Sequence, residues 1–174
     1  MKHTSSPSRT AIAATAAALA LAVCVDAAAA DGTVKGTLTY KAKGAPVTIA
    51  LKHAWLVKGP DAVEPKTIIR HLIFSATDIG AKVAACKTMS CTDADLGSGM
   101  TVDLDAGPRL NYWVVLDNQM VQYSGTAAPA VLKLTTDTPT RLAGKLTIDN
   151  VAAGGPKVDV EFDVPLLREL KAAR

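Results

Sequence analysis

Two histidines follow the N-terminal segment of this 174-residue chain, and both fall within segments that predict neighbouring strands. His53 lies in "PVTIALKHAWLVK" (46–58), and His71 lies in "KTIIRHLIFSA" (66–76). If the connection between these segments turns near Ala62, an antiparallel pairing sets the two imidazoles opposite each other. Such a pair can share zinc or copper, although the sequence nominates no third ligand. A His near a Trp on an apolar strand face is also typical of a packed, hydrogen-bonded side chain.

Two cysteines with four residues between them stand in "ACKTMSC" (85–91). Cys86 and Cys91 lack the Cys-x-x-Cys spacing of a thioredoxin-like redox centre, and two thiols alone fill half of a tetrahedral zinc shell. An isolated pair of cysteines in an oxidising compartment usually forms a disulfide with itself. The spacing therefore predicts a structural disulfide that fixes how a short helix turns back into the next strand.

An acidic loop, "DADLGSG" (93–99), follows the cysteines. Its Asp-x-Asp spacing resembles the start of a calcium-binding loop, in which oxygen ligands alternate along the chain. The fifth position of such a loop is Gly97 here and the twelfth is Leu104, so two of the expected oxygen ligands are missing. We therefore interpret Asp93 and Asp95 as solvated residues of a turn.

Aromatic side chains offer a second candidate site. Tyr112 and Trp113 are adjacent in a predicted strand, so they point to opposite faces and one of them belongs to the core. The other, together with Tyr123, predicts a patch that binds a ligand or a partner. The alternative is ordinary packing of aromatic residues on a sheet.

The motifs of common enzymes are missing from the sequence. None of the serines that follow the N-terminal segment lies in Gly-x-Ser-x-Gly, and no Gly-rich phosphate loop joins a strand to a helix. Most carboxylates alternate with apolar residues, as in "DLD", which is typical of solvent-facing strand positions. A small hydrolase without a legible motif remains an alternative.

The elements that would position these residues are short strands punctuated by Gly, Pro, Asn and Asp. We predict a mainly β fold, an antiparallel β-sandwich or a barrel of about nine strands with one short helix. The C-terminal "PLLRELKAAR" predicts a frayed helical turn. The predicted strands are 33–41, 46–58, 66–76, 100–105, 109–117, 119–125, 130–136, 140–149 and 156–164, and the helix falls within 77–89.

The N-terminal segment 1–30 has the features of a signal peptide: a basic start, an Ala-rich apolar run, and small residues before a cleavage point after Ala30. Residues 31–174 then form a single domain without a predicted membrane span. The formal net charge of the chain is +3, and no cluster of Lys and Arg predicts binding to nucleic acid.

The segment from Leu110 to Leu170, which begins "LNYWVVLDNQMVQYSGTAAPAVLKL", resembles a family of small exported bacterial proteins of no assigned function. The resemblance extends to the signal–strand start and the cysteine pair. It implies export and a β fold, and it implies no activity.

Together these features predict a non-catalytic binding or interaction module of the bacterial periplasm or cell surface, or a secreted one. Its partner would be an unknown protein or small ligand, and no cofactor is expected. One alternative is a periplasmic protein that binds zinc or copper through His53 and His71. The other is the small hydrolase.

Overall fold

The computed structural model describes residues 32–41, 44–117 and 121–174. The predicted signal peptide, 1–30, lies outside the described residues. The predicted mainly β fold is confirmed, because strands dominate the described chain and α1 is its only α-helix. No helix in these ranges is both long and apolar enough to cross a membrane.

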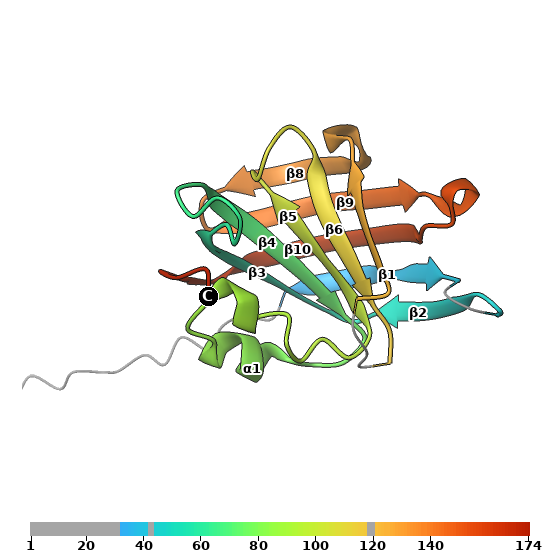
Figure 1. The fold of residues 1–174 in the computed structure, drawn as a ribbon, viewed down its shortest axis with the longest axis horizontal. Coiled ribbons are helices and arrows are strands. Elements are labelled where there is room, and N and C mark those ends of the chain that lie inside the picture. The colour runs from blue at the N-terminus through green and yellow to red at the C-terminus, as the bar shows by residue number, and fades with distance from the viewer. Residues whose placement is uncertain (1–31, 42–43, 118–120) are drawn as a thin grey trace, which may run out of the picture.

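The described residues contain ten strands, one α-helix and three short 3-10 helices (Figure 1). The strands are β1 (Thr33–Tyr40), β2 (Val47–Leu51), β3 (His53–Pro60), β4 (Ile68–Ser75), β5 (Gly99–Leu104), β6 (Leu110–Val115), β7 (Tyr123–Ala127), β8 (Leu132–Thr138), β9 (Arg141–Asp149) and β10 (Lys157–Glu169). The helices are α1 (Gly80–Ala85), η1 (Met89–Cys91), η2 (Pro129–Val131) and η3 (Val151–Ala153).

All ten strands belong to one sheet that curls on itself into a half-barrel. Its main order is β2-β1-β10-β3-β4-β5-β6-β7, and β9 and β8 continue from the other edge of β10. In Figure 1, β3 to β6 pass in front of β8, β9, β10 and β1. The first part of β10 pairs with both β1 and β9, and its last residues pair with β3. The two halves of the curled sheet therefore share β10.

The prediction of a purely antiparallel sandwich or barrel needs correction. β10 and β3 run parallel, with Leu166 opposite Leu56, whereas the other pairs of named strands are antiparallel in the described chain. The sheet is therefore mixed, and two separate sheets are not observed within these ranges. The sequence pattern did not predict the parallel pair, because β3 and β10 lie about a hundred residues apart in the chain.

The inner face of the curled sheet holds the main hydrophobic core. Both halves contribute fully buried side chains, among them Leu38 of β1, Phe74 of β4 and Tyr112 of β6. Phe74 packs edge-on against Phe162 of β10, with ring centroids 5.5 Å apart. The burial of apolar surface between the two halves stabilises the curled sheet.

The predicted strand 46–58 is two strands, which changes the direction of its side chains. β2 ends at Leu51 and β3 begins at His53, and the amide of Lys52 donates to the carbonyl of Ser75. Leu51 faces the inner core, but Trp55 packs on the outer face of the sheet. The prediction of one continuous strand over 46–58 is thus wrong at Lys52.

The C-terminus also differs from its prediction. β10 continues to Glu169, so the first half of the segment predicted as a helical turn is a strand. Its last residues gain backbone partners that keep it extended: the amide of Leu170 donates to the carbonyl of Lys58, at 2.7 Å.

A second hydrophobic cluster lies on the outer face of β3 and β4. The segment between β4 and β5, residues 76–98, contains α1 and η1 and covers this face, and we refer to it as the insertion. Ile79, Val83 and Leu96 of the insertion are buried against Trp55 and Ile73 of the strands. Because both faces are covered here, successive residues of β4 from His71 to Ser75 are buried.

Gly99 sits where the insertion joins β5, and it provides a test of this packing. A Cβ at Gly99 would lie 2.0 Å from the carbonyl oxygen of Phe74, inside the β4–β5 pair. We expect Gly99→Ala to lower the free energy of unfolding by about 1–3 kcal/mol, measured by urea denaturation. Gly107→Ala is the matched control, since no neighbouring atom lies within 4 Å of its added Cβ. Equal stability of the two variants would contradict the close approach of these strands.

Candidate ligand-binding pocket

A row of polar side chains crosses the outer face of the sheet. His71 of β4 is paired directly with Asp103 of β5, and Asp103 is paired with Asn111 of β6. Directly opposed residues point to the same face of a sheet, so the three side chains lie side by side. The same row begins at Val57 of β3, which is fully buried. Polar groups therefore replace the apolar surface of this face as it passes from β3 to β6.

The next row carries the apolar part of the site. Thr101 of β5 is paired with Ile73 on one side and with Trp113 of β6 on the other. Ile73 lies within the outer hydrophobic cluster, whereas Trp113 is only half-buried. The insertion thus covers the β3–β4 end of this row and leaves the indole of Trp113 accessible.

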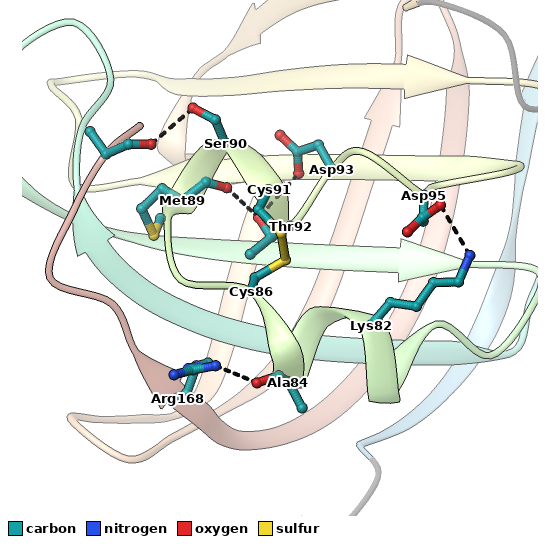
Figure 2. The surroundings of a disulfide bond; sticks show 11 residues. Lys82, Ala84, Cys86, Met89, Ser90, Cys91, Thr92, Asp93, Asp95 and Arg168 are labelled. Atoms are coloured by element: carbon teal, nitrogen blue, oxygen red, sulfur yellow. Dashed lines mark hydrogen bonds and ion pairs between the residues drawn. A yellow bond between two sulfur atoms is a disulfide. The ribbon is translucent and has the colours of Figure 1, made fainter.

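The insertion forms the opposite wall. It contributes Met89 and Leu96, which are buried, and Asp93, whose side chain is 47% exposed. A disulfide that closes a short loop and a set of hydrogen bonds hold this wall in place (Figure 2). Ser90 Oγ donates to the carbonyl of Ala173 at 2.9 Å, and Arg168 donates to the carbonyl of Ala84. The C-terminal segment is therefore a support for the wall.

The predicted disulfide is confirmed. Cys86 follows α1 and Cys91 ends η1, and their sulfurs are bonded. The bond joins the two helical turns of the insertion, as Figure 2 shows. Next to it, Thr92 Oγ1 donates to the carbonyl of Met89 at 2.7 Å. This clip fixes the direction in which the chain leaves η1 toward Asp93.

These walls enclose a pocket of about 700 Å³. Two exposed valines stand among its lining residues, Val63 in the β3–β4 loop and Val121 before β7. The lining residues are Pro60, Asp61, Ala62, Val63, Ile69, His71, Met89, Ser90, Asp93, Ala94, Leu96, Thr101, Asp103, Asn111, Trp113, Val115 and Val121.

The most perturbed group in the pocket is His71, which is only 5% exposed. Burial by itself lowers the pKa of an imidazole because it disfavours the charged form. Hydrogen bonds to Asp103 at Nδ1 and to Asp93 at Nε2, the latter 2.7 Å long, outweigh this effect and raise the pKa of His71 to about 10. His71 is therefore a buried imidazolium between two carboxylates at neutral pH.

This arrangement determines what His71 can do chemically. Both ring nitrogens donate to carboxylates, so the ring has no lone pair for accepting a proton from a substrate or for coordinating a metal. The imidazolium instead holds one oxygen of Asp93 and one oxygen of Asp103 in fixed positions. The remaining carboxylate oxygens are among the polar groups that line the pocket.

The predicted pairing of His53 with His71 is wrong. The β3–β4 register sets His53 opposite Ser75 and Val57 opposite His71, because the loop turns near Glu64. The histidines are thus offset by four positions, or about 13 Å along the strands, which is too far for them to share one ion. His53 stacks on Trp55 with ring centroids 5.8 Å apart. Within the described ranges, no group of three or more His, Cys, Asp or Glu side chains is arranged to hold a metal ion.

The predicted aromatic patch is divided between the two faces of the sheet. Tyr112 is fully buried in the inner core, where Tyr123 stacks on it at 6.0 Å between ring centroids. Asn150 donates to the hydroxyl of Tyr112, and burial raises the pKa of Tyr112 to about 12. Trp113 alone of the three reaches the pocket. The prediction that one of the two adjacent aromatics belongs to the core is confirmed.

The pattern of the sequence does not reveal the role of two carboxylates. It predicts Asp93 as a solvated turn residue and Asp103 as a solvent-facing strand residue, yet both accept hydrogen bonds from His71. The available signal for Asp103 was an acidic residue in "MTVDLD", near the middle of an otherwise apolar strand. Asp93 gave no such signal, since its approach to His71 depends on the path of the insertion.

No protein-family model matches the chain, and no curated protein matches it. Among solved structures, the crystal structure of BcnA from Burkholderia cenocepacia is similar over 75% of this chain and 94% of that chain, with 13% sequence identity and a TM-score of 0.28. A similarity at this level carries no argument about fold or function.

The buried imidazolium predicts a dependence of stability on pH. The folded-state pKa of His71 is raised from 6.5 to about 10, so its contribution is complete below pH 6.5 and is lost as the pH rises toward 10. We expect His71→Gln to lower the free energy of unfolding by about 3 kcal/mol at pH 7 and to flatten the decline between pH 7 and 10. Urea denaturation at pH 6, 7, 8.5 and 10 measures both effects.

His53→Gln is the control for this experiment, because His53 has no hydrogen bond to a carboxylate within the described chain. It should keep the pH dependence of the unsubstituted protein. An identical pH dependence in His71→Gln would contradict the proposed charge state of His71.

Proposed function

We propose that this protein is an exported, non-catalytic binding protein that holds a small amphipathic molecule in the pocket between the insertion and β6. The observation that carries the proposal is the pocket of about 700 Å³ beside Trp113 and the His71 carboxylates. Pockets of 300–1,000 Å³ with mostly apolar walls and a few placed polar groups are typical of small-molecule sites.

The composition of the walls supports an amphipathic ligand. Ile69, Met89, Leu96, Trp113 and Val115 supply apolar and aromatic surface, and the carboxylates of Asp93 and Asp103 lie beside His71. A concave site of this size suits a small molecule. A protein partner usually needs a larger contact surface. Between the two kinds of partner left open by the sequence, the pocket therefore favours a small ligand.

The state of His71 supports a binding role over catalysis. It is the buried residue in the pocket with the strongest potential as a general base, and both of its nitrogens are hydrogen-bonded to carboxylates. A hydrolase of the Ser-His type needs one of these nitrogens to accept the proton of the nucleophile.

Three features support export to the bacterial periplasm, to the cell surface or to the medium. Residues 1–30 have the pattern of a signal peptide, and the chain resembles a family of small exported bacterial proteins. The disulfide between Cys86 and Cys91 is of the kind that persists in oxidising compartments.

Binding of the neutral apolar fluorophore N-phenyl-1-naphthylamine tests the pocket. We expect saturable binding with an increase in its fluorescence. Ala94 is an exposed residue of the pocket wall, so Ala94→Trp should fill part of the volume without burying a new side chain in the core. We expect this variant to weaken binding of the fluorophore at least tenfold, as measured by fluorescence titration.

The matched control is Ala153→Trp, the same change at an exposed position in η3 that does not line the pocket. It should bind the fluorophore as the unsubstituted protein does. Absence of saturable binding, or equal binding by the two Trp variants, would contradict a ligand site in this pocket.

Mass spectrometry of the protein after expression in a bacterium tests export. We expect a mature chain that begins at Asp31, with a mass lower by two hydrogens than the reduced chain, in the periplasmic fraction or the medium. Reduction should restore these two hydrogens. A full-length chain that stays in the cytoplasm would contradict the export part of the proposal.

A further inference from the structure

We propose that the ligand of this pocket is a small organic cation, an amine joined to an apolar body. The inference rests on the proposed function, because it names the chemical class that the same pocket selects. It is carried by the position of two carboxylates, one aromatic ring and the apolar walls around a single cavity.

The charges that line the cavity are unbalanced. Asp61, Asp93 and Asp103 are three carboxylates, and His71 is the one basic side chain beside them in the described part of the lining. Lys82, on the same insertion, pairs with Asp95 at 3.0 Å and does not line the pocket. With an imidazolium at position 71, the lining keeps a net negative charge at neutral pH. An anion would meet repulsion in this cavity, and a cation would meet attraction.

The geometry leaves carboxylate acceptors for the ligand beside His71. His71 donates both of its N–H groups to the first oxygens of Asp93 and Asp103. The second oxygen of Asp103 has no hydrogen-bond partner within the described ranges. Among the described residues that are buried or half-buried, as Asp103 is, every fully buried side-chain oxygen has a hydrogen-bond partner. That oxygen is therefore accessible. An ammonium group, which has three donors, matches such acceptors.

Trp113 adds a second feature that attracts a cation. Its half-buried indole lies on β6, one row from Asp103 and directly opposite Thr101. The face of an indole ring attracts ammonium groups, and the interaction is stronger when the site is partly desolvated. Met89, Leu96 and Val115 surround the remaining space with apolar surface. The pocket thus offers a charged end and an apolar end to one molecule.

A matched series of three molecules tests the charge preference. The molecules are 4-phenylbutylamine, 4-phenylbutan-1-ol and 4-phenylbutanoate, which share one apolar body and carry a positive, neutral or negative end at pH 7. Each competes with N-phenyl-1-naphthylamine for the mature protein. We expect the amine to bind about tenfold more tightly than the alcohol, and the carboxylate to bind most weakly. The preference for the amine should decrease as salt is added.

Substitution of two neighbouring carboxylates of the insertion distinguishes a charge effect inside the pocket from a general effect of the protein's charge. Asp93→Asn keeps an oxygen that can accept from His71 but removes one charge from the pocket, so the amine-to-alcohol ratio should fall toward one. Asp95→Asn removes the same charge two residues away, from a side chain that pairs with Lys82 outside the pocket. It should keep a ratio of about ten.

Several results would overturn the inference. The first is binding of the alcohol or the carboxylate that is as tight as that of the amine, or tighter. The second is that none of the three molecules displaces the fluorophore. The third is an equal loss of the amine preference in Asp93→Asn and Asp95→Asn. The proposed function is tested separately by the fluorophore and the Ala94→Trp variant. If the fluorophore binds and the amine preference is missing, the binding protein stands and its cation specificity does not.

Discussion

The structure depends on the pairing of β10 with three other strands. Along residues 157–163 this strand is hydrogen-bonded to β1 on one edge and to β9 on the other, and beyond Leu166 the edge used by β1 is taken by β3 in a parallel register. Because one strand belongs to both halves, the sheet must curl, and the inner faces of the halves enclose the main core. β10 therefore connects the two halves, and it contributes Val158, Val160 and Phe162 to their shared core.

The insertion covers apolar residues that the curled sheet leaves on its outer face. β3 and β4 use one face for the inner core and still carry apolar residues such as Trp55 and Ile73 on the other. The 76–98 segment covers that outer face, and its disulfide and its bonds to the C-terminal segment keep it there. The cover reaches Val115 of β6 but leaves Trp113 accessible, and the pocket lies at this boundary. The site is therefore a consequence of how far the insertion extends over the sheet.

The sequence predicted most strands because alternating patterns and turn residues are local signals. It predicted the disulfide because only Cys86 and Cys91 follow the N-terminal segment. Non-local features were not accessible in the same way. The turn near Glu64 moved the partner of His71 from His53 to Val57, and a break at Lys52 moved Trp55 to the outer face. A shift of a few residues in register reassigns every cross-strand pair, so the site could not be assembled from strand positions alone.

The charged groups that line the pocket fit the proposed binding role better than a stabilising one. Buried ion pairs contribute little net stability compared with apolar residues of similar volume, because taking charges out of water is costly. Around Trp55 and Ile73, which do not line the pocket, this protein covers the same face of the sheet with apolar residues. At His71, Asp93 and Asp103 it instead places three ionisable groups in contact beside an accessible indole. The imidazolium holds the carboxylates in the lining of the cavity, and the net negative charge of that lining is what the proposed preference for a cation depends on.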